Sequence, residues 1–208
     1  MKKLLLGFFI SSIFISCASD QTELPFLGPT QTLADGSVKH HQIPAFSFVN
    51  QYGDTVTNAD FDGKVYVADF FFTTCPTICP VMKTQMSRIY DKFKGRDDFK
   101  ILSHTIDPYH DSVQVLNEYA ARLGVEGDMW NFVTGTQDSI YAIGQKSYMV
   151  TAAADTANMA ETGGFIHSGA FILVDKQRHV RGIYDGTVEQ EVSQLIRDLE
   201  LLLNEEDK

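Results

Sequence analysis

The positions of apolar and polar residues divide the chain into alternating strands and helices. Lys64–Phe72 is an almost continuous apolar run, which is typical of a strand buried on both faces. Pro80–Lys94 places its apolar side chains at helical spacing, so they share one side. Further strands are expected at Phe99–Ile106, Trp130–Thr134, Gly169–Asp175 and His179–Tyr184, and further helices at Ser112–Arg122, Gln137–Tyr148 and from Thr187 to about Leu203.

Turn and cap signals refine this outline. Phe46–Val49 and Thr55–Thr57 flank a turn cluster and predict a hairpin at the N-terminal side of the sheet. Asp111 is expected to cap the helix that follows it, and Thr187 with Gln190 to form a capping box. Because strands and helices alternate, we expect an α/β fold with a mixed sheet, helices on both faces and this N-terminal hairpin.

The first residues have the pattern of an export signal. Two lysines precede Leu4–Ile15, an apolar run too short to cross a bilayer of about 30 Å as a helix. Ser16-Cys17 then resembles a bacterial lipoprotein cleavage box, although an ordinary signal with a chance cysteine is the alternative. We therefore expect a signal peptide at 1–16, a lipidated, loosely structured tether at 17–40 that begins with Cys17, and one folded domain at 41–208.

The charge balance limits the partners. The 208 residues carry a formal net charge of −10, and no cluster of lysine and arginine stands out. Nucleic-acid binding requires such a cluster, so we expect no nucleic-acid partner. With Cys17 assigned to the lipid, two cysteines remain, Cys75 and Cys79. A pair four residues apart closes too small a loop to stabilise a fold, which favours redox or metal chemistry.

The two cysteines lie between a buried strand and a helix start. Backbone N–H groups and the helix dipole at such a place favour thiolate over thiol. Two thiolates can form a disulfide, attack a peroxide, or bind a soft metal such as copper(I) or zinc. A metal held by two sulfurs would need a third ligand. From its position before the strand at Gly169–Asp175, His167 is our choice, with a histidine hydrogen-bonded to backbone as the open alternative.

The other histidines are weaker candidates. His104 lies inside a predicted strand, where a histidine satisfied within the core is expected. His110 and His179 fall in turn and hairpin positions on the surface. His40 and His41 fall at the end of the tether, where no specific role is expected. Met82 and Met86 have helical spacing and are assigned to the core.

Four segments, in order, carry a family resemblance. They contain a Cys-x-x-x-Cys-Pro box, an Asp-Pro segment, a tryptophan strand ending in Thr-Gly, and a strand preceded by histidine. They lie at Phe71–Pro80, Thr105–Asp111, Trp130–Gly135 and Ile166–Asp175. Together they resemble the SCO/SenC family of copper chaperones, which have a thioredoxin-like fold, and the resemblance extends from about Ile43 to the last helix.

The resemblance implies specific roles. In that family the two cysteines and this histidine bind copper, as Cu(I) or Cu(II), which assigns Cys75, Cys79 and His167 as metal ligands. The family assists assembly of the binuclear copper centre in subunit II of cytochrome c oxidase. The implied protein is an extracytoplasmic, membrane-anchored lipoprotein whose partners are that subunit and the membrane.

Other functions remain open from sequence. The main alternative is an extracytoplasmic thiol–disulfide reductase that acts on the cysteines of the same copper centre. Such reductases usually space their cysteines by two residues and carry a cis-proline, whereas no proline follows Pro108 here. A peroxiredoxin would need Thr or Ser where Phe72 stands. A copper store or redox sensor is a further alternative.

Overall fold

The structure is a computed structural model that describes residues 23–150, 152–154 and 165–205, with the backbone alone at 152–154 and 165–167. The strands are β1 (Gln31–Thr32), β2 (Val38–Lys39), β3 (Ser47–Asn50), β4 (Thr55–Thr57), β5 (Val65–Phe71), β6 (Phe99–Thr105), β7 (Trp130–Thr134), β8 (Ala152–Ala154), β9 (Phe165–His167), β10 (Ala170–Val174) and β11 (Val180–Asp185). The helices are the 3₁₀ helix η1 (Asn58–Phe61) and α1 (Cys79–Phe93), α2 (Val113–Arg122), α3 (Gln137–Lys146) and α5 (Glu189–Asn204).

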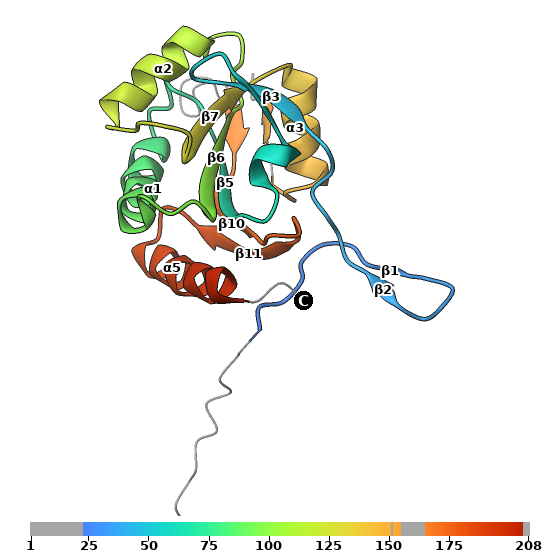
Figure 1. Cartoon of the computed structure of the whole chain (residues 1–208). Coiled ribbons are helices and arrows are strands. Elements are labelled where there is room, and N and C mark those ends of the chain that lie inside the picture. Colours follow the sequence, from blue (N-terminus) through green and yellow to red (C-terminus); the bar gives the residue numbers. More distant parts are fainter. Residues whose placement is uncertain (1–22, 151, 155–164, 206–208) are drawn as a thin grey trace, which may run out of the picture.

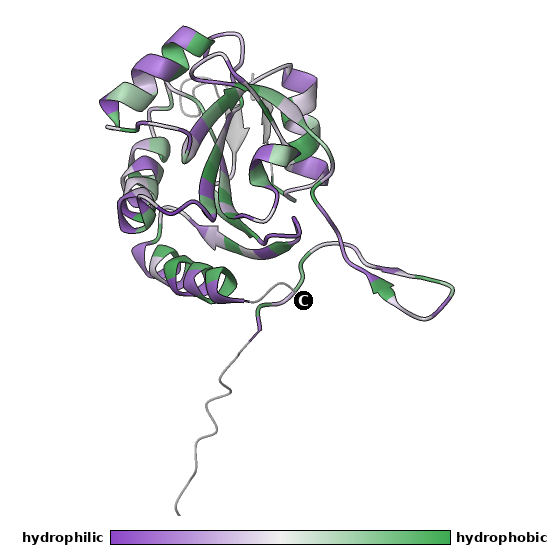
Figure 2. Ribbon diagram, viewed as in Figure 1, coloured by the Kyte–Doolittle hydropathy of each residue, from purple (hydrophilic) through white to green (hydrophobic). Residues whose placement is uncertain are grey.

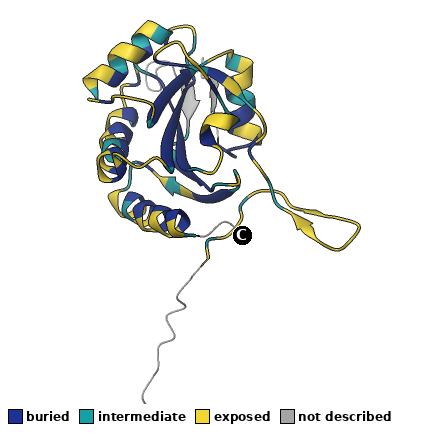
Figure 3. Cartoon of the chain, viewed as in Figure 1, coloured by how far each residue is buried: buried dark blue, intermediate teal, exposed yellow. Residues whose placement is uncertain are grey.

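A seven-stranded mixed sheet forms the centre, in the order β11-β10-β5-β6-β7-β3-β4 (Figure 1). β5, β6 and β7 are parallel, whereas β10, β11, β3 and β4 join them antiparallel. All seven residues of β5 are buried, as its near-continuous apolar pattern predicts, and all seven of β6 are buried as well, although several of them are polar (Figure 3). The predicted N-terminal hairpin is present as β3 and β4.

Helices cover both faces of the sheet. α1, α2 and α5 lie on one face, and α3 and η1 on the other (Figure 1). Their apolar sides turn toward the strands and their polar sides toward solvent (Figure 2). Tyr119 of α2 stacks on Phe71 of β5 and meets Phe132 of β7 edge-on, whereas Tyr148, after α3, meets Phe70 on the opposite face. The predicted α/β fold, a thioredoxin-like mixed sheet, is confirmed.

Two helix caps differ from the prediction. The hydroxyl of Ser112 accepts the backbone N–H of Val115, so Ser112 caps α2 and Asp111 does not. α5 follows Val188 without a side-chain cap, because the Thr187 hydroxyl donates to Asp185 instead. Both predictions were wrong because a polar residue beside a helix start can bond elsewhere.

The segment before β3 also differs from the expected loose tether. Leu27 donates its backbone N–H to Val180 of β11 at 2.8 Å, and Ile43 donates to Arg178 at 2.9 Å. The guanidinium of Arg181 donates to two carbonyls of the same segment. The stretch at residues 24–27 and Ile43 therefore contact the end of the sheet where β10 turns into β11, whereas the β1–β2 hairpin between them projects away from it (Figure 1). The predicted signal peptide and Cys17 lie outside the described residues.

The histidines of this segment make contacts that the sequence did not indicate. A ring nitrogen of His41 lies 2.8 Å from the Ser147 carbonyl, and His40 stacks on Phe26 with ring centroids 4.2 Å apart.

None of the described helices combines the length and apolar character needed to span a membrane. Strand β8 pairs antiparallel with β9; residues 151 and 155–164 lie outside the described part of the structure.

His104 is a core residue, as predicted, but its polar atoms are not satisfied. It is fully buried in β6, stacked on Phe70 and edge-on to Phe48. Within the described residues, neither ring nitrogen has a hydrogen-bond partner. Burial lowers the pKa of His104 from 6.5 to about 3, so the ring is neutral in the folded protein at physiological pH.

This burial predicts an acid-sensitive stability. Below pH 6.5 the unfolded chain protonates His104 and the folded protein does not, down to pH about 3. The free energy of unfolding should therefore fall by about 1.4 kcal/mol per pH unit across that window. In His104→Leu, the loss between pH 7 and pH 5 should be smaller by about 2 kcal/mol, measured by urea unfolding. The exposed His110→Leu is the control, and equal pH dependence in both variants would contradict the assignment.

Candidate metal and thiol site

The cysteine loop joins the carboxyl end of β5 to the start of α1. Cys79 is the first residue of α1, and Pro80 fits the first turn because that position has no hydrogen bond to lose. Cys75 lies in the loop, where its backbone N–H donates to the Phe72 carbonyl. The side chains are nearly covered, with Cys75 8% exposed and Cys79 2%. Both cysteines are free thiols.

Asp111 fixes the loop to the neighbouring strand. Its carboxylate, fully buried, accepts the backbone N–H of Thr73 at 3.1 Å and the hydroxyl of Thr73 at 2.5 Å. It also accepts the hydroxyl of Thr105, the last residue of β6, at 2.5 Å. The residue predicted as a helix cap therefore holds the amino-terminal part of the cysteine loop. The Asp107 carboxylate, by contrast, accepts the backbone N–H of His110 in its own turn, and the Asp107 backbone carbonyl accepts those of His110 and Asp111.

A buried ion pair fixes the other side of the site. Lys83, one turn after Cys79, places its ammonium 2.5 Å from the Asp69 carboxylate of β5, with side chains 3% and 0% exposed. The other Asp69 oxygen accepts the hydroxyl of Ser103, which in turn accepts the indole N–H of Trp130 at 2.9 Å. The Lys83 ammonium also lies 4.3 Å from the Phe71 ring centroid. The charge is thus compensated and rigidly held.

The thiols interact with each other and with few other groups. A hydrogen bond with Cys75 and burial raise the pKa of the Cys79 thiol, and the nearby Lys83 ammonium offsets part of that rise. The expectation that the helix start favours a thiolate is therefore not met at Cys79 in the metal-free protein. The Thr77 hydroxyl lies 3.7 Å from the Cys75 sulfur.

His167 lies on a segment that reaches the cysteine loop. It ends β9, where its backbone is paired with Ala152, and its side chain lies outside the described part of the structure. Two residues later, a Cβ on Gly169 would lie 3.7 Å from the Ile78 side chain, next to Cys79. The segment that enters β10 thus passes beside the loop, as predicted. Among the described side chains, no group of three or more cysteines, histidines or acids could hold a metal.

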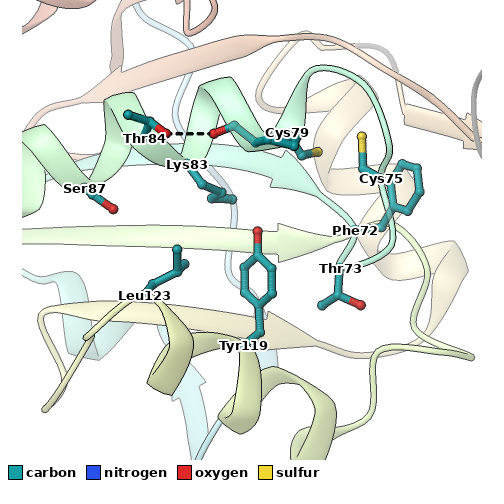
Figure 4. A pocket seen from close by; sticks show the side chains of 10 residues that line it. Phe72, Thr73, Cys75, Cys79, Lys83, Thr84, Ser87, Tyr119 and Leu123 are labelled. Carbon is teal, nitrogen blue, oxygen red and sulfur yellow. Dashed lines mark hydrogen bonds between the residues drawn. The ribbon is translucent and has the colours of Figure 1, made fainter.

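A cavity of about 440 Å³ opens beside the two sulfurs, between α1 and α2. Lys83, Thr84 and Ser87 line it from α1, and Tyr119 and Leu123 from the side of α2 (Figure 4). The Tyr119 hydroxyl points toward the part of α1 that carries Cys79 and Lys83. Sequence reasoning found both cysteines but missed Lys83, Asp69 and Tyr119. The available signal was a lysine on the buried side of α1, between Met82 and Met86.

The contacts of Asp111 predict that its substitution loosens the cysteine loop. Asp111→Ala leaves one N–H and two hydroxyls without their acceptor, so it should lower the free energy of unfolding by about 3 kcal/mol and speed alkylation of Cys75. Asp107→Ala is the matched control and should cost less than about 1 kcal/mol. Urea unfolding and a thiol-alkylation time course test this. Equal stability and alkylation rates in the two variants would refute the role of Asp111.

Comparison with known proteins agrees with this geometry. The family model SCO1/SenC matches residues 34–204. The SCO1 protein homolog of Bacillus subtilis is 31% identical over 162 residues, which cover 77% of this chain and 82% of that protein. The crystal structure of a SCO1/SenC family lipoprotein from Bacillus anthracis has a TM-score of 0.71 at 28% identity, covering 79% of this chain and 96% of that one. BsSco has a TM-score of 0.69 at 30% identity, covering 80% and 95%. The chain therefore belongs to the SCO1/SenC family.

Proposed function

We propose that this protein binds copper through Cys75 and Cys79. The observation that carries the proposal is a pair of hydrogen-bonded thiols on a buried loop at a helix start, in a chain of this family. Two thiolates select copper(I) or zinc among common ions, and family membership favours copper. The thiols must lose their protons on binding, so copper uptake should release protons. The rigid supports at Asp111 and Lys83 hold the sulfurs in place for the ion.

His167 is the proposed third ligand. Its segment passes beside the loop, and Gly169, two residues later, lies against Ile78, which supports an imidazole of this segment as the ligand. His104 is no competitor, because its ring is enclosed by aromatic side chains. Imidazole is a harder ligand than thiolate and therefore matters more for copper(II) than for copper(I).

The proposed role is delivery of copper to cytochrome c oxidase during its assembly. BsSco, 30% identical, is described as a member of the Sco family of cytochrome c oxidase assembly proteins. We extend that role to this chain, with the binuclear copper centre of subunit II as the recipient. The membrane location rests on Cys17, and the Bacillus anthracis relative is described as a lipoprotein.

A thiol–disulfide reductase is the second candidate. The two thiols are in hydrogen-bonding contact, which favours disulfide formation, and BsSco is described as containing a disulfide switch. Such a protein would reduce the cysteines of the copper centre before the metal arrives. Cysteine substitutions would abolish either function, so they do not separate the two.

His167→Ala separates the two candidates. The variant should fold normally and still form the disulfide, because the two thiols are unchanged. Its affinity for copper(II) should fall by more than about tenfold, with a smaller loss for copper(I), and oxidase assembly in cells should be lost. Metal titration of the reduced protein with spectroscopy of the bound ion, and a cellular oxidase assay, measure these outcomes.

The controls fix the meaning of that result. His104→Leu should change stability without a selective loss of copper. Wild-type protein oxidised to the disulfide should bind copper poorly, because both sulfur ligands are consumed. If His167→Ala supported full oxidase assembly while Cys75→Ser did not, the reductase function would replace the copper function.

The anchor has its own test. If Cys17 carries lipid, wild-type protein should incorporate labelled fatty acid, and Cys17→Ala should be released from membranes or left unprocessed. More than one acyl chain is expected, since a single chain gives only weak, reversible binding. Fractionation and metabolic labelling measure both effects. Absence of label together with unchanged membrane partition in the variant would exclude lipidation of Cys17.

A further inference from the structure

The cavity between α1 and α2 contains chemistry that copper coordination does not use. It adjoins both cysteines and has a volume of about 440 Å³. The ammonium of Lys83 lies in its wall and is 4.3 Å from the Phe71 ring centroid. Tyr119 stacks on the same phenylalanine, with ring centroids 5.4 Å apart. The Phe71 ring therefore contacts both the fixed ammonium and the ring of the phenol.

The Tyr119 hydroxyl is an unused donor. Among the described residues it has no hydrogen-bond partner, and it points toward the part of α1 that bears Cys79 and Lys83 (Figure 4). A phenol hydroxyl is protonated at physiological pH and can donate one hydrogen bond. The Tyr119 hydroxyl and the Lys83 ammonium are both suited to bind an anion. Because they lie near the sulfurs of Cys75 and Cys79, the anion they suit is one that reacts with sulfur.

We propose that this cavity is a receiving subsite for the thiolate of a cysteine on a partner protein, held by the charge of Lys83 and the hydroxyl of Tyr119 next to Cys79. The inference rests on the proposed function, because a partner that accepts copper from Cys75 and Cys79, or reduces them when they form a disulfide, must present its own thiolate to them. The subsite lies on the α2 side of the sheet, whereas the ribbon of β8 and β9 packs against α3.

The geometry assigns the order of bond changes when the pair is a disulfide. The incoming thiolate attacks the Cys79 sulfur, a new sulfur–sulfur bond forms, and Cys75 leaves as a thiolate. The Thr77 hydroxyl, 3.7 Å from the Cys75 sulfur, is placed to donate to that leaving group. With a dithiol, the second thiol then attacks its own partner sulfur and releases Cys79. Two electrons and two protons pass from the dithiol to the protein.

The test uses copper-free, oxidised wild-type protein and dithiothreitol as the dithiol. Tyr119→Phe keeps the ring that stacks on Phe71 and removes only the hydroxyl. The second-order rate constant for reduction should fall by at least about tenfold, the value expected for one hydrogen bond to an anion in the transition state. The equilibrium reduction potential of the disulfide should stay unchanged. Tyr52→Phe, on the exposed turn between β3 and β4, is the matched control and should match wild type.

A second variant removes the charge without leaving a buried ion unpaired. Lys83→Met combined with Asp69→Asn keeps an acceptor for Ser103 and should also slow reduction at least threefold. A third readout locates the attack: with a monothiol and rapid alkylation, the mixed disulfide should be on Cys79 and the alkyl group on Cys75. Unchanged rates in both variants, parallel changes in rate and potential, the reverse labelling, or failure of the pair to oxidise would each overturn the proposal. Copper titration is independent, so a failed copper function and a failed subsite give different results.

Discussion

The ammonium of Lys83 has a fixed place in the interior, and the site depends on it. It is bonded to Asp69 of β5 and lies against Phe71, so α1 cannot shift over the sheet without separating two buried charges. Removing one partner of such a pair typically costs about 3–5 kcal/mol. Cys79 stands one helical turn before Lys83 and is positioned by the same contact. Asp111 holds the opposite end of the loop at Thr73. Between these two supports the sulfurs have little freedom.

Much of the fold follows from local patterns, because the near-continuous apolar run of β5 indicates burial on both faces and the helices show apolar residues at helical spacing. The cysteine loop could be found for a similar reason: two cysteines before a proline-started helix have few structural uses. The supports of the loop could not be found in this way. Asp111 and Ser112 are both good cap residues, and only the folded chain brings Asp111 to Thr73, 38 positions earlier. His104 was placed in the core correctly, but its missing hydrogen bonds depend on the aromatic rings around it.

The acidic surface and the buried lysine act on sulfur chemistry in opposite directions. A net charge of −10 repels anions, and at an ionic strength of about 0.1 M salt screens that repulsion at distances beyond about 10 Å. Lys83 acts only inside the cavity, next to Cys79. The net charge therefore repels a small thiolate from the protein as a whole, and the Lys83 ammonium attracts it only inside the cavity. A folded partner can overcome the repulsion with contacts of its own, which favours protein recipients over free thiols.

The contact between the N-terminal segment and β11 sets a height above the membrane. The Val180 carbonyl accepts the backbone N–H of Leu27. Val180 is paired with Val174, and Val174 with Tyr66 at the amino end of β5, whereas the cysteine loop follows the carboxyl end of that strand. Leu24 is seven positions after Cys17, so the two are at most about 25 Å apart along the chain. If Cys17 carries lipid, the amino end of β5 stays near the bilayer. The sulfurs, at the carboxyl end of β5, then lie farther from the bilayer by up to the length of that strand, about 23 Å. Under the proposed anchor and the proposed delivery of copper, a recipient embedded flush with the membrane would be out of reach, and its copper centre would have to stand on a domain that projects to the same height.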